Sequence, residues 1–190
     1  MHSTLAHKTI YKMRTLLNNF MDVIDNFLPE REFEHIKDIL LGADFPWFCN
    51  SRIVKPENHD IVEDFYNYQF THSLYRNYSP CSNYFNEICD PLFTKINPAS
   101  IMRVKANLIP RADKNVVHEY HQDITHFKGK TAIYYLNTNN GKTYFDDFDP
   151  IDAVENRLVI FNSDILHTGS TCTDQRVRVV LNLNYFEWNK

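Results

Sequence analysis

The sequence RLVIFNSDILH, residues 157–167, joins a run of β-forming side chains to a polar turn and a histidine. Residues 158–161 are branched or aromatic, which favours a buried strand, and residues 162–164 have the polar composition of a turn. A second stretch, RVRVVLNLNYF at residues 176–186, has the same β-forming character. The sequence therefore predicts two strands in the C-terminal part, with His167 directly after the first of them.

Two more strands are expected earlier in the same half. Residues 101–109 alternate roughly between apolar and polar side chains, and residues 131–137 (TAIYYLN) are rich in β formers. Asn139-Asn140-Gly141 separates TAIYYLN from KTYF at residues 142–145. Because a type I′ turn needs two residues with positive φ, this tripeptide predicts a hairpin between these two stretches.

The first hundred residues have mainly helical patterns. Residues 21–28 favour a short strand, after which Pro29 begins a helix that ends at Gly42. The apolar face of this helix comprises Phe33, Ile36, Ile39 and Leu40. A second helix is expected over residues 82–95 and must end before Pro98. Its apolar stripe comprises Phe85, Ile88, Leu92 and Phe93.

Helices followed by a run of strands predict an α+β layout. The second half is expected to be a β-sandwich or small barrel, with the helices packed against one sheet. The aromatic segment at residues 65–78 supports no assignment. No linker or repeat divides the 190 residues, a length that suits one domain.

Composition excludes several functional classes. With only four glycines, the chain has no glycine-rich phosphate loop of the Walker or dinucleotide type. The net charge of −4 and the absence of a long Lys/Arg run disfavour a nucleic-acid partner held by its phosphates. No apolar stretch approaches the ~20 residues of a membrane span, and residues 1–20 lack a signal-peptide core, so we expect a cytoplasmic protein without a membrane partner.

Cysteine and asparagine usage adds two expectations. The four cysteines form no CxxC pair, so we interpret them as buried or incidental thiols rather than zinc ligands. The chain has 20 asparagines, which we expect to occupy many of the left-handed turn positions that glycine usually takes. This composition also suits an AT-rich coding genome such as that of a phage, in which case the protein would act in the host cytoplasm.

The residues with chemical potential lie in the predicted strands. His121 and Asp123 are two residues apart, so on a strand both side chains would lie on the same face. His167 follows the predicted strand at residues 157–162, and Arg178 lies inside the apolar final strand. Two histidines and one aspartate on one face leave adjacent coordination positions open, the pattern of non-haem Fe(II) sites. A buried arginine nearby would pair with a carboxylate through two hydrogen bonds.

This set of residues resembles the Fe(II)- and 2-oxoglutarate-dependent dioxygenases, and within them the prolyl 4-hydroxylase-like branch, which includes phage forms. The resemblance covers residues 101–186 and rests on His121-x-Asp123, His167, Arg178 and the ending Asn184-Tyr185-Phe186. YYLN at residues 134–137 and NRLVIF at residues 156–161 also match strands of that branch in order. The resemblance implies a double-stranded β-helix, also called a jelly roll or cupin-like fold. On this basis residues 1–190 form one oxygenase domain, with an extension at 1–20, a helical support region at 21–100 and the jelly-roll core at 101–186.

The resemblance also implies the roles of individual residues. His121, Asp123 and His167 would bind Fe(II), and Arg178 would bind the distal carboxylate of 2-oxoglutarate, a contact that the Tyr135 hydroxyl would share. The implied reaction converts 2-oxoglutarate and O2 to succinate and CO2 while a substrate C–H bond is hydroxylated. Because imidazoles bind metals in their neutral form, Fe(II) affinity should fall below about pH 6.

Some positions leave alternatives open. Arg176 lies two residues before Arg178 and is the competing candidate for the carboxylate. Gln175 and Val180 stand where the family often has a glycine and a small hydroxyl residue, and Asn140-Gly141-Lys142 replaces a frequent Gly-Gly pair. His118 and His126 flank the motif, and their spacing fits solvated or supporting groups better than ligands.

Three functional hypotheses follow. The first is an active hydroxylase of a peptidyl or free amino acid such as proline. The second is a catalytically silent, metal-binding jelly-roll module. The third is a nucleobase oxygenase, which the modest basic content disfavours. The primary substrate, the oligomeric state, the source organism and the choice between Met1 and Met21 as the start stay open.

Overall fold

The computed structural model describes residues 21–53, 66–123 and 128–188. The extension expected at residues 1–20 and His126 lie outside this part of the chain. The elements follow the order β1 (Met21–Ile24), α2 (Glu30–Leu41), β2 (Phe48–Asn50), β3 (Gln69–Arg76), β4 (Ser79–Pro80), α3 (Phe85–Ile96), β5 (Ser100–Pro110), β6 (Lys130–Tyr135), β7 (Asn139–Phe145), β8 (Ile151–Ala153), β9 (Leu158–Asn162), β10 (His167–Gly169) and β11 (Val177–Phe186).

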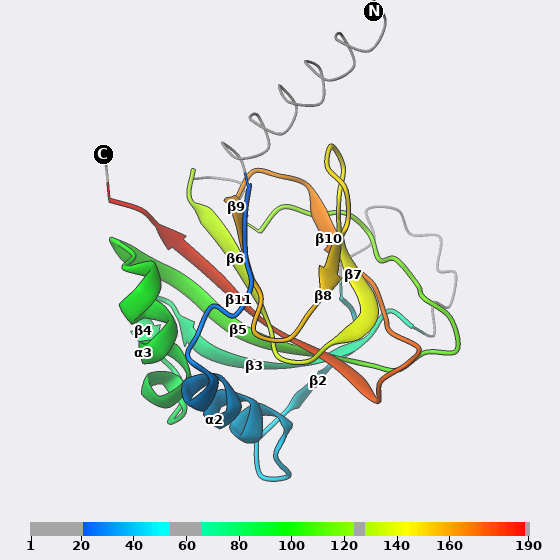
Figure 1. The fold of residues 1–190 in the computed structure, drawn as a ribbon, viewed down its shortest axis with the longest axis horizontal. Helices are drawn as coiled ribbons and strands as arrows, with labels where there is room; N and C mark the ends of the chain where they lie inside the picture. Colours follow the sequence, from blue (N-terminus) through cyan, green and yellow to red (C-terminus); the bar gives the residue numbers. More distant parts are fainter. Residues whose placement is uncertain (1–20, 54–65, 124–127, 189–190) are drawn as a thin grey trace, which may run out of the picture.

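The strands form two sheets (Figure 1). The large sheet has the order β1-β9-β6-β11-β5-β3-β2, with β4 added beside β3, and the small sheet has the order β10-β7-β8. The strand pairs of the described residues are all antiparallel, and β11 lies between β5 and β6 in the large sheet. The predicted strands of the second half are all present, and the segment left unassigned at residues 65–78 contains β3.

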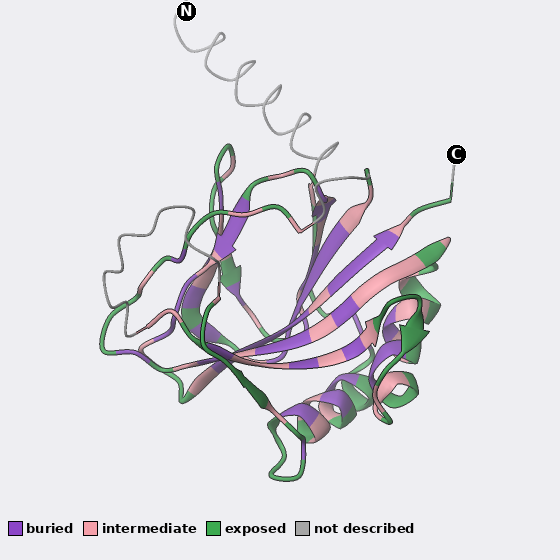
Figure 2. Cartoon of the chain, turned by 180° about the vertical axis from the view of Figure 1, so that it is seen from behind, coloured by how far each residue is buried: buried purple, intermediate pink, exposed green. Residues whose placement is uncertain are grey.

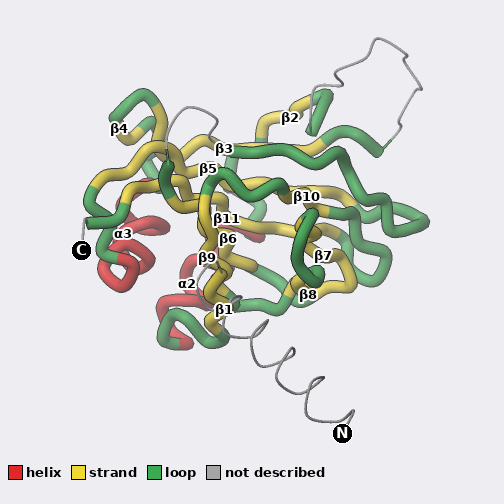
Figure 3. The backbone as a smooth tube through the Cα atoms, turned by 90° about the horizontal axis from the view of Figure 1, so that it is seen from above, coloured by secondary structure: helices red, strands yellow, loops and turns green. Residues whose placement is uncertain are grey.

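Helices α2 and α3 cover one face of the large sheet, and the small sheet covers the opposite face (Figures 1 and 3). Alternation along the central strands produces this arrangement, because successive side chains point to opposite faces. Tyr134 of β6 and Leu181 of β11 pack with the helices, whereas Tyr135 and Val180 pack toward the small sheet. The expected arrangement of helices against one sheet is thus confirmed.

Both helices follow their predicted apolar faces. Helix α2 begins after Pro29 and ends at Gly42, as expected. Its Phe33, Ile36 and Leu40 are buried, each contributing about 1.5–3 kcal/mol of hydrophobic stabilisation. Helix α3 begins three residues later than expected, at Phe85. In Figure 2 the buried residues lie on the inner sides of the helices and along the central strands, and the exposed residues lie on the outer sides of the helices, on turns and on the short strands β2 and β4.

Asparagine takes most of the left-handed backbone positions, as its abundance predicts. Among the described non-glycine residues with positive φ, four are asparagines, namely Asn26, Asn77, Asn97 and Asn156, and the fifth is Tyr78. Asn156 is buried and uses its side chain as well. Its Oδ1 accepts hydrogen bonds from Leu28 N at 2.9 Å and from Tyr134 Oη at 2.7 Å. This residue therefore joins the turn before β9 to the start of α2.

The hairpin predicted at Asn139-Asn140-Gly141 is wrong. These residues begin β7, which pairs with β8 and β10 in the small sheet, whereas TAIYYLN forms β6 in the large sheet. No described glycine has positive φ. Gly141 instead gives space to another side chain, because a Cβ at this position would lie 2.9 Å from Arg178 Cδ. The glycine that resembles a turn residue in the sequence therefore serves a packing contact with Arg178, far along the chain.

The region at residues 21–100, expected as helical support, also contributes strands. β1 pairs with β9, and β3 pairs with β5, so this region extends both sides of the large sheet. Cys89 and Cys172 are buried, Cys49 and Cys81 are exposed, and all four thiols are free. No helix in the described ranges is both long and apolar enough to cross a membrane.

Candidate active site

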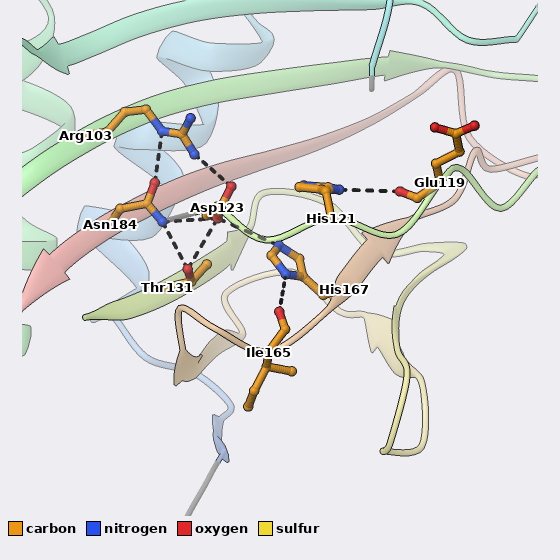
Figure 4. Close-up of polar contacts among 8 residues, drawn as sticks. All are labelled: Arg103, Glu119, His121, Asp123, Thr131, Ile165, His167 and Asn184. Atoms are coloured by element: carbon orange, nitrogen blue, oxygen red, sulfur yellow. Dashed lines mark hydrogen bonds and ion pairs between the residues drawn. The ribbon is translucent and has the colours of Figure 1, made fainter. Parts of the chain in front are cut away.

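Three potential metal ligands lie together at the edge of the small sheet. His121 and His167 exchange two backbone hydrogen bonds of 3.0 Å, which place the segment of His121 beside β10. The segment around His121 and Asp123 is not a regular strand as expected, since it is held by isolated bridges. One donor atom from each of His121, Asp123 and His167 lies within 4.8 Å of the other two. Figure 4 shows these three side chains converging.

His167 is oriented as a ligand would be. Its Nδ1 donates to the carbonyl oxygen of Ile165 at 3.0 Å, so the lone pair resides on Nε2. Nε2 is buried, has no hydrogen-bond partner among the residues that the structure describes, and lies 3.7 Å from Asp123 Oδ2. Burial lowers the pKa of His167, the charge of Asp123 opposes this effect, and the net pKa lies below 6.5. The imidazole is therefore neutral at neutral pH, the form that binds metals.

Asp123 is held by a hydrogen-bond network that the sequence did not reveal (Figure 4). Arg103 Nη2 donates to Asp123 Oδ1 at 2.7 Å, and Asn184 Nδ2 donates to Asp123 Oδ2 at 3.0 Å. Thr131 Oγ1 donates to Oδ2 at 3.3 Å, and Arg103 Nε donates to Asn184 Oδ1 at 2.9 Å. Burial raises the pKa of Asp123, but the charges of Arg103 and His167 and the hydrogen bond from Asn184 lower it. The lowering effects together are larger, so the net pKa lies below its ordinary value. The carboxylate is thus ionised and fixed in orientation.

Arg178 is a buried cation that pairs with no carboxylate in the part of the chain that the structure describes. It is 3% exposed, its Nη2 donates to Thr143 Oγ1 at 3.1 Å, and its Nε has no hydrogen-bond partner within residues 21–53, 66–123 and 128–188. Burial lowers the pKa of the guanidinium, and Tyr135 opposes this effect. Because an unpaired buried charge is costly, an arginine in this state points to an anionic ligand.

Two glycines of the small sheet accommodate Arg178. A Cβ on Gly141 would lie 2.9 Å from Arg178 Cδ, and a Cβ on Gly169 would lie 3.3 Å from Arg178 Nη1. The first distance is shorter than real Cβ contacts allow, so a side chain at residue 141 would displace the arginine. These two residues therefore shape the space around the guanidinium.

A cavity of about 80 Å³ connects the arginine to the three potential ligands. Its lining consists of Ile53, Gln69, Lys105, Asn107, Ile109, His118, His121, Asp123, Ile133, Thr143, His167, Thr168, Gly169, Arg178, Val180 and Asn182. Most of these residues come from β5 and β11 of the large sheet and from β7 and β10 of the small sheet. The cavity therefore lies between the two sheets.

The other sequence candidates fall in different places. Arg176 is exposed in the turn before β11 and does not line the cavity, unlike Arg178. The Tyr135 hydroxyl shares a 2.6 Å hydrogen bond with Thr143 Oγ1, and its ring lies 5.7 Å from Arg178 Cζ. Tyr135 thus contacts the arginine and is not part of the cavity lining. His118, expected to be solvated or supporting, is buried and lines the cavity.

The donor set fits a non-haem Fe(II) ion. Two imidazoles and one carboxylate supply three ligand atoms, and among the described residues no group forms a hydrogen bond with the buried Nε2 of His167. The carboxylate is ionised and His167 is neutral, as coordination requires. Arg178 lies in the same cavity, where it would pair with a carboxylate of a cosubstrate.

Solved structures share this architecture. A prolyl hydroxylase from Trichoplax adhaerens, in complex with a hypoxia-inducible-factor oxygen-degradation-domain peptide fragment, has a TM-score of 0.61 at 15% identity over 98% of this chain and 94% of its own. A 2OG-Fe(II) oxygenase family oxidoreductase from Burkholderia pseudomallei has a TM-score of 0.60 at 11% identity over 92% and 89%. The chain has the fold of the 2-oxoglutarate and Fe(II) oxygenases.

A third solved structure has a similar fold. A prolyl-4-hydroxylase from Pseudomonas putida has a TM-score of 0.56 at 14% identity over 89% of this chain and 93% of its own. No protein-family model matches the chain, and no curated protein matches it in sequence. The expected double-stranded β-helix is confirmed at the level of the fold.

Proposed function

We propose that this chain is an Fe(II)- and 2-oxoglutarate-dependent dioxygenase that hydroxylates a C–H bond of a peptidyl or free amino acid. The reaction would convert 2-oxoglutarate and O2 to succinate and CO2. One observation carries the proposal: the His121, Asp123 and His167 donor atoms share a cavity with Arg178, a buried cation that no carboxylate of the described residues pairs with. The oxygenase fold and the peptide bound to the Trichoplax protein support it.

Each residue then has a defined role. His121, Asp123 and His167 would hold Fe(II), which when bound supplies the activation of O2. Arg178, whose Nε has no hydrogen-bond partner among the described residues, would bind the distal carboxylate of 2-oxoglutarate, while Tyr135 and Thr143 contact the guanidinium. Apolar side chains in the lining, such as those of Ile133 and Val180, would exclude water from the reacting groups.

Arg103, Asn184 and Thr131 act through Asp123. Their hydrogen bonds fix both carboxylate oxygens and leave Oδ2 turned toward His167. Such supporting contacts set the orientation of a ligand and the affinity for its metal. They are positioning residues in this proposal.

Anaerobic titration of the purified protein with Fe(II) and then 2-oxoglutarate tests the function. Chelation of Fe(II) by a 2-oxo acid produces a weak visible absorption band. We expect this band in the wild type, its loss in His167→Ala, and a weaker 2-oxoglutarate affinity in Arg178→Ala. Arg176→Ala is the matched control and should behave as wild type, since Arg176 is exposed outside the cavity.

The alternative outcome is equally informative. A well-folded protein that binds Fe(II) but shows no band on addition of 2-oxoglutarate would contradict the dioxygenase proposal. The silent metal-binding module would then be the better account of the same three ligands.

A further inference from the structure

The floor of the cavity is an ordered set of cross-strand pairs between β5 and β11. Arg178 lies opposite Ile109, Val180 opposite Asn107, and Asn182 opposite Lys105. All six residues line the cavity, since alternate residues of a strand share one face. The Lys105 pair therefore lies about 13 Å along the strand from the Arg178 pair, at roughly 3.3 Å per residue. The next pair, Asn184 and Arg103, is the one that holds Asp123.

Lys105 is a second cation that lines the cavity. Its Nζ makes no hydrogen bond or ion pair within the described residues. The nearby carboxylate of Asp123 already accepts hydrogen bonds from other donors at both of its oxygens. Arg103, on the same face of β5, already supplies the positive charge that pairs with Asp123. A lysine is therefore not needed there to balance the carboxylate.

Charge balance leaves this lysine for another anion. Asp123 is the one acidic residue among the described lining residues, whereas Lys105 and Arg178 are both cationic. A doubly charged Fe(II) ion and the 2-oxoglutarate dianion would neutralise each other. The excess positive charge of the protein groups would then favour one further anionic group in the cavity.

Two unpaired amide oxygens lie beside Lys105 on the same floor. Asn182 Oδ1 and Asn107 Oδ1 are buried and accept no hydrogen bond from any described residue, and Asn107 is only 5% exposed. An unsatisfied buried acceptor costs about 1–3 kcal/mol, so a ligand that donates an N–H or O–H would relieve it. The ligand that fits this floor therefore combines an anionic group with a hydrogen-bond donor.

We infer that Lys105 and Asn182 form a second carboxylate subsite, separate from Arg178, which binds the carboxylate of the primary substrate. The substrate class is then a small carboxylic acid with an N–H donor, that is, a free or C-terminal amino acid rather than an internal peptide residue. This inference rests on the proposed function. The metal-proximal carboxylate of 2-oxoglutarate is the other source of the same chemistry, and the experiment separates the two.

The test compares acids with their neutral amides. The protein is loaded anaerobically with Fe(II) and saturating 2-oxoglutarate and titrated with N-acetyl amino acids and with the matching N-acetyl amino acid carboxamides. Binding is measured by calorimetry and by the shift of the visible band. For at least one pair we expect the acid to bind about tenfold more tightly than the amide, the scale of one hydrogen bond to a charged group.

Variants of Lys105 assign that preference. Lys105→Met should reduce the ratio to about one while changing the 2-oxoglutarate affinity less than about threefold, whereas Lys105→Arg, which keeps the charge, should retain the preference. Lys142→Met is the matched control, because Lys142 forms an ion pair with Asp152 outside the cavity. Circular dichroism of each variant confirms that it is folded.

Two results would overturn the inference. One is the lack of any acid preferred over its amide in the wild type, and the other is a tenfold or larger loss of 2-oxoglutarate affinity in Lys105→Met, which would assign the lysine to the cosubstrate. The band is recorded before any probe is added. Its absence would count against the proposed function, whereas a normal band without a carboxylate preference would count against this subsite alone.

Discussion

Arg103 donates from Nη2 to Asp123 Oδ1 at 2.7 Å, while the second oxygen, Oδ2, stays 3.7 Å from His167 Nε2. The arginine therefore fixes the direction in which the carboxylate presents its ligand oxygen. We expect Arg103→Met to weaken Fe(II) affinity about 10–100-fold, the usual effect of removing a group that orients a ligand. Competition with a chromogenic Fe(II) chelator under anaerobic conditions measures this change.

The control for Arg103 is an arginine on the outside of the molecule. Arg31 is exposed on α2, which lies on the other face of the large sheet from the small sheet and the metal ligands. Arg31→Met should therefore bind Fe(II) as the wild type does. Equal affinities in the two variants would show that Arg103 has no orienting role.

The contact between Gly141 and Arg178 predicts a graded series. Gly141→Ala would place a Cβ 2.9 Å from Arg178 Cδ and the same distance from the Thr171 carbonyl oxygen. We expect this variant to lose about 1–3 kcal/mol of unfolding free energy through overpacking and to bind 2-oxoglutarate at least tenfold more weakly. Gly169→Ala, with a 3.3 Å contact to Arg178 Nη1, should have smaller effects. Urea unfolding and 2-oxoglutarate titration measure both, and a reversed order of the two variants would contradict this packing argument.

The unpaired charge of Arg178 predicts opposite effects on stability and on binding. Without ligands, Arg178→Met removes a buried cation that pairs with no described carboxylate, so the unfolding free energy should rise by about 1 kcal/mol. The same change should weaken 2-oxoglutarate binding about 100-fold, because two hydrogen bonds to a charged group contribute about 3 kcal/mol. Arg176→Met should change neither quantity. A loss of stability in Arg178→Met without ligands would show that the guanidinium is already satisfied by Thr143 and Tyr135.

The sequence was most informative where local signals and packing agree. Pro29 and Gly42 bound α2 as predicted, because each acts on its own turn of backbone. The pairing of β7 was mispredicted because Gly141 serves a contact with Arg178, which lies far along the chain. A jelly roll depends on such distant pairings, which an isolated tripeptide cannot specify.

The site shows the same division between local pattern and context. His121, Asp123 and His167 were singled out by residue type and order, and the structure brings them together. Arg103 and Lys105 were missed, since polar residues alternating with apolar ones on a strand usually indicate a solvent-facing side. Here the apolar face of β5 packs on the helices, so its polar face is directed into the cavity. The alternation shows that β5 has one polar face, but only the position of the small sheet shows that this face lines a cavity rather than facing solvent.

The depressed pKa of His167 predicts how the metal-free protein responds to acid. The folded protein binds a proton at His167 less readily than the unfolded chain, whose histidine titrates near 6.5. As the pH falls below that value, the unfolded state gains protons first, so the unfolding free energy should decrease until the pH reaches the lower pKa of the folded state.

His167→Gln cannot titrate at this position, so the variant should lose this part of the pH dependence. Asp123, whose pKa is also lowered, loses its contribution only below its ordinary value of 3.8, which separates the two effects. Urea unfolding in the presence of a chelator between pH 7.5 and 4.5 measures the slopes, and identical slopes in wild type and His167→Gln would show that burial does not disfavour the imidazolium.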